Sequence, residues 1–170
     1  MPARTTLTLG MLAAALAAAA PLAGCGFTPL YARPGVSQGL SAIEVVAPRG
    51  RVGYLLREDL DDEFGRDHDT APVWRLEMEL VQTRSPRGLT IADVAQRYQL
   101  GVRVRYNLTE IATGRIVHSG EVASQVSYDA ADQPYAGIAA RQDSQQRSAA
   151  DAARRIRLDL SAWFNRRGAG

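Results

Sequence analysis

Cysteine and histidine are scarce in this 170-residue chain, which limits the chemistry that its side chains can support. Cys25 is the only cysteine, so no disulfide can form within the chain. The histidines are His68 and His118, and no grouping of His, Cys, Asp and Glu has the spacing of a zinc site. The sequence therefore predicts no metal site and no cofactor.

Lysine is absent, so all 20 basic residues are arginines, whose planar side chains can each contact a carboxylate or phosphate through two donors. The formal net charge is only +2, and the aromatic residues do not interleave with the basic ones. Because a basic surface is the electrostatic signature of nucleic-acid binding, we do not expect nucleic acid as a partner.

Motifs that mark enzyme active sites are also missing. The chain has no Gly-rich phosphate loop between a strand and a helix, and no G-x-S-x-G nucleophile elbow. Asp67-His68-Asp69 could move protons, but it has the composition of a solvated loop after a helix, and His118 falls within a strand. We therefore expect no catalytic residue and no enzyme activity.

The N-terminal segment has the order of an export signal. Arg4 forms a short basic region, and the apolar run from Leu7 to Leu22 is shorter than the ~20 residues of a spanning helix. Leu22-Ala23-Gly24-Cys25 resembles the lipobox of bacterial lipoproteins, where cleavage precedes a cysteine that carries diacylglycerol. We predict a signal peptide at 1–24 and lipid attachment at Cys25.

The mature chain has the length of one domain. Prolines and glycines at 25–39 predict an extended, lipidated tether. A single α+β domain is expected at 40–165, followed by a disordered tail at 166–170.

Hydrophobic periodicity predicts four strands and two helices. Residues 97–108 alternate without a break, which excludes a helix there. The predicted strands cover 42–46, 74–80, 97–108 and 116–128, with a turn at 85–88 after the second. The predicted helices cover 52–64, with Gly65 as the stop, and 135–164.

This order, β-α-β-β-β-α, predicts a two-layer α+β sandwich with a four-stranded mixed sheet and both helices packed on one face. Each strand then has one apolar face and one solvent-facing face. In the last strand, we expect the apolar face to carry Ile116, His118, Val122, Val126 and Tyr128.

Three arginines of the 97–108 strand share its solvent-facing side because strand side chains alternate: Arg97, Arg103 and Arg105. Such a row could bind phosphate groups through charge-assisted, two-pronged hydrogen bonds. In the alternative, the arginines pair across strands with acids: Glu77, Glu79 and Glu121. The strand register decides between the two.

Several motifs follow the order found in one protein family. The lipobox and the following Gly26-Phe27-Thr28-Pro29-Leu30-Tyr31 resemble the start of the lipopolysaccharide-assembly lipoprotein family, LptE. Distal motifs resemble the alphaproteobacterial branch of that family: Tyr98-x-Leu100, Thr113-Gly114-Arg115, Ser127-Tyr128-Asp129-Ala130, Pro134-Tyr135-Ala136-Gly137-Ile138 and Gln142-Asp143.

The resemblance implies a two-helix, four-stranded sandwich that plugs the outer-membrane β-barrel LptD, helps to assemble it and supports lipopolysaccharide transport to the outer leaflet. It implies a lipid anchor at Cys25 on the periplasmic face of the outer membrane, with the barrel and lipopolysaccharide as partners. Arg97, Arg103 and Arg105 are candidate contacts for lipopolysaccharide phosphates on separate grounds.

Two alternatives remain. An auxiliary lipoprotein of an envelope lipid-transport ABC system would expose an apolar patch, whereas a barrel plug should be mostly polar outside. A lipid-anchored hydrolase would place His68 or His118 beside a nucleophile.

Overall fold

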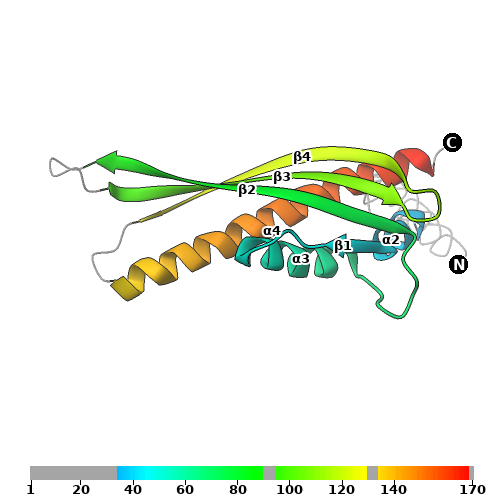
Figure 1. The fold of residues 1–170 in the computed structure, drawn as a ribbon, viewed down its shortest axis with the longest axis horizontal. Helices are drawn as coiled ribbons and strands as arrows, with labels where there is room; N and C mark the ends of the chain where they lie inside the picture. The colour runs from blue at the N-terminus through cyan, green and yellow to red at the C-terminus, as the bar shows by residue number, and fades with distance from the viewer. Residues whose placement is uncertain (1–33, 90–94, 130–133, 169–170) are drawn as a thin grey trace, which may run out of the picture.

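Seven elements form the part of the chain that the structure, a computed structural model, describes: residues 34–89, 95–129 and 134–168. In chain order they are α2 (Pro34–Ser41), β1 (Ile43–Val46), α3 (Arg51–Phe64), β2 (Trp74–Leu89), β3 (Ala95–Glu110), β4 (Arg115–Asp129) and α4 (Pro134–Arg167). Figure 1 shows β2, β3 and β4 in one layer and α3 and α4 below it, with short β1 beside α3.

The sheet has the order β1-β2-β3-β4, with β1 parallel to β2 and the other pairs antiparallel. The predicted α+β class with a mixed sheet is therefore confirmed. Short β1 pairs only with Trp74 to Glu77 at the start of β2. The rest of β2 and its partner β3 extend beyond β1 and α3 as a long hairpin (Figure 1).

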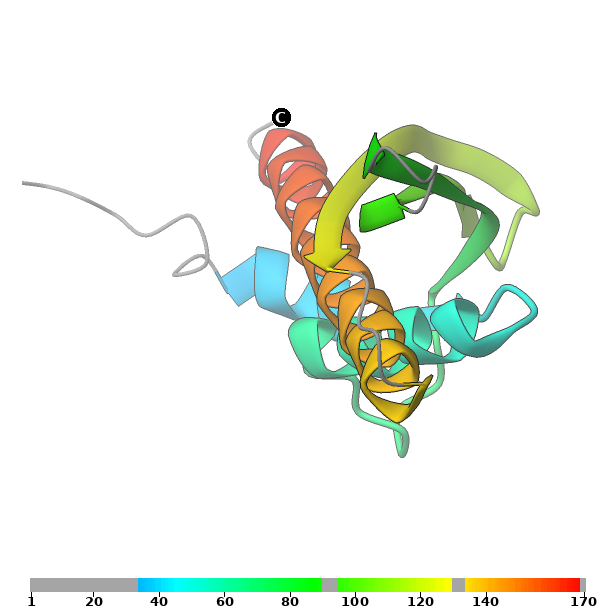
Figure 2. The same ribbon diagram turned by 90° about the vertical axis from the view of Figure 1, so that its left-hand side faces the viewer.

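The helix layer covers one face of the sheet, which we call the inner face, as the turned view of Figure 2 shows. Leu56 and Leu60 of α3 and Ile156 and Leu160 of α4 are fully buried, at spacings of four that place each pair on one helix face. Burying such a side chain stabilises the fold by ~1.5–3 kcal/mol. The opposite, solvent-facing side of the sheet is the outer face.

Small side chains form the buried face of the middle part of α4. The buried residues there are Ser144, Ser148, Ala149, Ala152 and Ala153. Gly65 ends α3 as predicted, in the left-handed conformation (φ 59°), with the Arg66 N–H bonded to the Asp61 carbonyl at 3.1 Å.

The predicted extended tether at 25–39 is wrong at its C-terminal end, because Pro34–Ser41 is helix α2. Val36 and Leu40, four residues apart, are buried in the core on one face of this helix. Tertiary packing thus stabilises a helix too short to be stable alone. Residues 25–33 lie outside the described residues.

The predicted tail at 166–170 is wrong for its first two residues, since α4 continues through Arg167. The Arg167 guanidinium lies 4.9 Å from the centre of the Trp74 ring of β2, so a cation–π contact holds the last turn of α4 against the sheet. It also lies 5.3 Å from the ring of Trp163 in the same helix.

The turn predicted at 85–88 is also wrong, because β2 continues to Leu89 with Pro86 opposite Tyr98. Proline is tolerated there because β1 ends opposite Glu77 and leaves this part of β2 at the sheet edge.

Ile116 does not share the apolar face predicted for the last strand. Leu108 lies opposite His118, but Thr109 lies opposite Ile116, so Val117 is an extra residue in β4. This bulge reverses the alternation. Val117 packs against the core, while Ile116 is 60% exposed.

Candidate functional site

Three arginines mark the outer face of the sheet. Arg97, Arg103 and Arg105 alternate with buried residues of β3, and their side chains are 59–65% exposed. Period-two alternation places all three on the outer face, as predicted. We call these residues the arginine row.

Each arginine of the row contacts an acid of β4. Glu121 lies directly opposite Arg105 and accepts a hydrogen bond from its Nε at 2.8 Å, and its other oxygen lies 3.4 Å from Arg103 Nε. Arg97 donates to Asp129, also directly opposite, at 2.8 Å. Cross-strand pairing is thus present, and one carboxylate serves two arginines.

The electrostatics of this group follow from the shared carboxylate. The hydrogen bond from Arg105 lowers the pKa of Glu121, and the charges of Arg105 and Arg103 add to the effect. The pKa of Arg105 is raised in turn, mainly by Glu121 and to a smaller extent by Glu79, which lies opposite it on β2. Glu77 lies on the same strand, opposite Asn107.

A shallow hollow of about 200 Å³ lies beside the row on the outer face. Arg103 and Arg105 line it with Glu79, Thr83 and Gly101. The volume is below the ~300–1,000 Å³ of typical small-molecule sites. The hollow suits one charged group of a larger ligand better than a whole buried small molecule.

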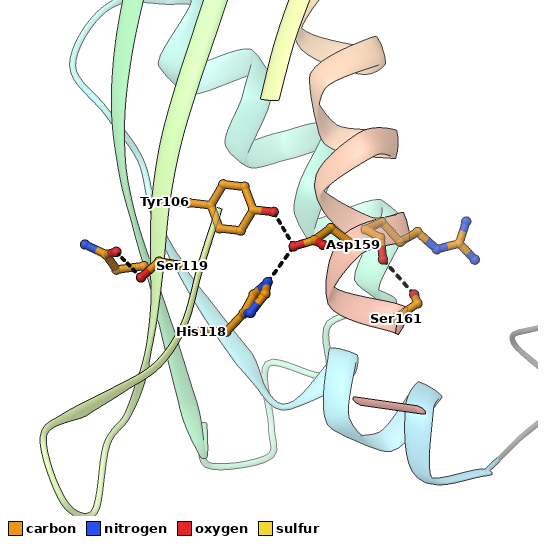
Figure 3. Close-up of polar contacts among 7 residues, drawn as sticks. Tyr106, His118, Ser119, Asp159 and Ser161 are labelled. Carbon is orange, nitrogen blue, oxygen red and sulfur yellow. Dashed lines mark hydrogen bonds and ion pairs between the residues drawn. The ribbon is translucent and has the colours of Figure 1, made fainter. Parts of the chain in front are cut away.

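A second polar group lies on the inner face, between the sheet and α4 (Figure 3). Tyr106 of β3 donates its hydroxyl proton to Asp159 Oδ2 at 2.6 Å, and His118 Nε2 of β4 lies 2.5 Å from the same oxygen. Burial and then the hydrogen bond to Asp159 raise the pKa of Tyr106. Burial alone would raise the pKa of Asp159, but the hydrogen bonds from His118 and Tyr106 lower it.

This second group links three elements rather than forming a nucleophilic site. Ser119 donates to Asn107 Oδ1 at 2.7 Å, and Ser161 donates to the Arg157 carbonyl at 2.6 Å. Figure 3 shows both serines directed away from His118. His68 is exposed in the loop after α3. The hydrolase alternative receives no support from these positions.

The family to which the chain belongs follows from comparison with known proteins. A model of the LptE family, described as lipopolysaccharide-assembly, matches residues 40–160. The chain belongs to the LptE family. Its role therefore lies in lipopolysaccharide assembly, as an outer-membrane lipoprotein.

Solved structures share the LptE fold. A candidate lipoprotein from Caulobacter crescentus CB15 is 42% identical with a TM-score of 0.68, covering 78% of this chain and 98% of that chain. A minor lipoprotein from Acinetobacter baumannii is 17% identical with a TM-score of 0.51, and the match covers 71% of this chain and 88% of that chain. Lipoprotein B from Nitrosomonas europaea is 16% identical with a TM-score of 0.54, and the match covers 72% of this chain and 83% of that chain. The last two comparisons concern the fold alone. No curated protein matches the chain.

Sequence reasoning did not find two acids of this LptE-family domain. Asp129 lies one residue past the predicted strand at 116–128, and its pairing with Arg97 depends on the β3–β4 register. Asp159 falls within the predicted helix at 135–164, where nothing assigned it a partner, yet it faces Tyr106 and His118. Tyr106 and His118, polar side chains on the mostly apolar face of their strands, were the available signal for a partner.

Other features bear on membrane and metal chemistry. Within residues 34–89, 95–129 and 134–168, no helix is long and apolar enough to cross a membrane. The same residues contain no group of three or more His, Cys, Asp or Glu that could hold a metal ion. Cys25 lies outside the described residues, so its lipid attachment stays a prediction.

Proposed function

We propose that this LptE-family domain is held by a lipid on Cys25 at the periplasmic face of the outer membrane, where it plugs and helps to assemble an LptD-like β-barrel. In this role it supports lipopolysaccharide transport to the outer leaflet, as a binding protein without catalysis or cofactor. The observation that carries the proposal is the division of the sheet into an inner face covered by helices and an outer face rich in charged groups.

The outer face suits the inside of a large barrel. The lumen of a barrel of this kind is polar, so the surface of a plug should present polar and charged groups. The arginine row with Glu121 and Asp129 supplies such groups along β3 and β4. The core residues of α3 and α4, among them Leu56, Leu60 and Ile156, are already buried against the inner face.

Depletion tests the assembly role. We expect depletion of the protein to lower the amount of assembled barrel and of surface lipopolysaccharide together, with recovery when the intact chain is restored. Immunoblotting of the barrel and surface labelling of lipopolysaccharide measure the two quantities. Normal levels of both after depletion would falsify the assembly role.

The lipid anchor has a separate test. Mass spectrometry of membrane-extracted protein should show a mature N-terminal peptide that starts at Cys25 and carries acyl mass. A chain that still starts at Met1, or a soluble chain cut elsewhere, would contradict the anchor.

We also propose that the arginine row binds lipopolysaccharide phosphates. Arg103 and Arg105 share Glu121, so one carboxylate cannot satisfy all donors of two guanidinium groups. A phosphate group could accept the remaining donors, and hydrogen bonds between charged partners are the strong kind.

Changing Arg97, Arg103 and Arg105 to Gln tests this contact. We expect weaker lipopolysaccharide binding at low salt, with a smaller difference from the unmodified protein at high salt. The matched control changes three arginines of α4 that also pair with acids: Arg147, Arg154 and Arg155. Equal binding by both triple variants would assign the row a structural role only.

A further inference from the structure

Three exposed apolar side chains form a short row at one end of the outer face. Val73, Ile111 and Ile116 are 49%, 39% and 60% exposed, respectively. The Ile111 N–H donates to the Val73 carbonyl at 3.1 Å, and Ile116 lies opposite Thr109, two residues before Ile111. These spacings place Val73 across from Ile111, and Ile116 on the diagonal from Ile111 on the neighbouring strand. We call them the terminal apolar row.

The row lies on the face that the helices do not cover. Val73 precedes Trp74, whose side chain is buried, so alternation turns Val73 outward. The bulge at Val117 turns Ile116 to the same side. The outer face therefore has an apolar end as well as the charged region around the arginine row.

The position of the terminal apolar row in the fold indicates which surface covers the row. Figure 1 shows the start of β2 and the β3–β4 turn at the same end of the molecule as α2. Pro34, the first residue of α2, lies nine residues after Cys25. Nine residues span at most ~30 Å. A lipid on Cys25 would therefore keep Pro34, at this end of the domain, within ~30 Å of the bilayer surface.

The apolar character of the row fits a phospholipid surface. Arg115 precedes Ile116 in β4 and lies opposite Glu110, so alternation turns Arg115 to the other face of the sheet. Exposed apolar side chains suit the boundary between lipid headgroups and acyl chains. An adaptor protein could also expose an apolar patch, but the anchor distance favours lipid.

We infer that the terminal apolar row is a membrane-contact surface that inserts into the headgroup region of the anchored membrane. This contact sets the orientation of the domain relative to the bilayer. The inference rests on the proposed lipid anchor at Cys25 and is independent of the barrel role.

The single cysteine makes the test specific. Because lipid attachment consumes the Cys25 thiol, Ile116→Cys adds one reactive thiol that takes an environment-sensitive nitrobenzoxadiazole label. The control is Ala123→Cys, another exposed position of β4, beside the hollow of the outer face. The lipidated full-length proteins are placed in vesicles of phosphatidylethanolamine and phosphatidylglycerol.

We expect emission from the label at residue 116 to rise roughly twofold or more and to move to shorter wavelengths in vesicles, because the probe enters the acyl boundary. The label at residue 123 should change little. Equal emission changes at both positions in acylated protein would overturn the inference alone. A change at residue 116 only after a barrel protein is added would also overturn it and assign the row to that protein. A preparation without acyl mass on Cys25 would overturn the anchor and this inference, whereas loss of the barrel role would leave both intact.

Discussion

Gly120 of β4 lies directly opposite Tyr106 of β3 and leaves the space that the phenol ring occupies. A Cβ atom at residue 120 would overlap the ring and hydroxyl of Tyr106. That hydroxyl is the donor to Asp159 of α4. The missing side chain of Gly120 therefore allows Tyr106 to connect the sheet to the long helix.

The first prediction concerns this space. Gly120→Ala should displace Tyr106 and lower the free energy of unfolding by ~1–3 kcal/mol, because an overpacked interior must shift. Thermal unfolding should show a Tm lower by ~2–4 °C for each kcal/mol lost. The control is Gly35→Ala in α2, where an added Cβ meets nothing within 4 Å. Equal Tm values for the Gly120 variant and the unmodified protein would show that the ring is free to move.

The second prediction concerns acid stability. Folding lowers the pKa of Asp159, so its ionised form stabilises the folded state. This contribution is present above about pH 4 and is lost as the pH falls through the folded-state pKa. Asp159→Asn should therefore lower stability at neutral pH by roughly 0.5–1 kcal/mol after allowance for solvent screening, and the deficit should shrink in acid.

Urea unfolding at several pH values measures that deficit. Asp143→Asn, which removes an exposed carboxylate of the same helix, is the control. If the loss of unfolding free energy in the Asp159 variant stays constant down to acidic pH, the side chain of Asp159 stabilises the fold through its packing rather than its charge.

The third prediction concerns Asp59, whose ionised form lowers the stability of the folded state instead of raising it. Burial raises the pKa of Asp59, and the neighbouring charges of Glu58, Asp62 and Glu63 raise it further. Its ionised form therefore destabilises the fold, a cost that is present above the folded-state pKa and disappears as the pH falls to the unfolded value. Asp59→Asn should stabilise the protein at neutral pH by roughly 0.5 kcal/mol after allowance for solvent screening.

Chemical unfolding of the Asp59 variant at neutral and acidic pH checks this gain, which should vanish in acid. Asp61→Asn on the same helix removes a carboxylate 3.5 Å from Arg57 and should bring no gain. If both variants gain equally, the general negative charge of α3 is responsible rather than the position of Asp59.

The fourth prediction tests the shared carboxylate of the arginine row. Glu121→Gln removes the charge that Arg103 and Arg105 contact, so both guanidinium groups become more available to phosphate. Lipopolysaccharide binding should tighten about two- to fivefold at low salt and less at high salt. Binding assays over a salt series measure this, with Asp143→Asn as the control that releases Arg147 on the helix layer. Unchanged affinity would separate the row from lipopolysaccharide binding.

Local patterns determined most of the secondary structure. Unbroken alternation defined β3, helical spacing defined α3 and α4, and Gly65 ended α3 because it can adopt a positive φ. Each of these signals lies within a few neighbouring residues, so it can be detected in the sequence. The same signals led to the correct α+β class and to the placement of the arginine row on one face.

Contacts between distant segments decided the rest. Helix α2 depends on burial of Val36 and Leu40 in the core, and the outward turn of Ile116 depends on a bulge against β3. The partners of the arginine row depend on register, which joins Arg105 to Glu121 across 16 residues of sequence. A strand pattern identifies which face a side chain occupies, but it carries no information on which residue of the next strand lies opposite. Tertiary structure therefore decided which charges meet, which apolar residues stay exposed, and where α4 is joined to the sheet through Asp159.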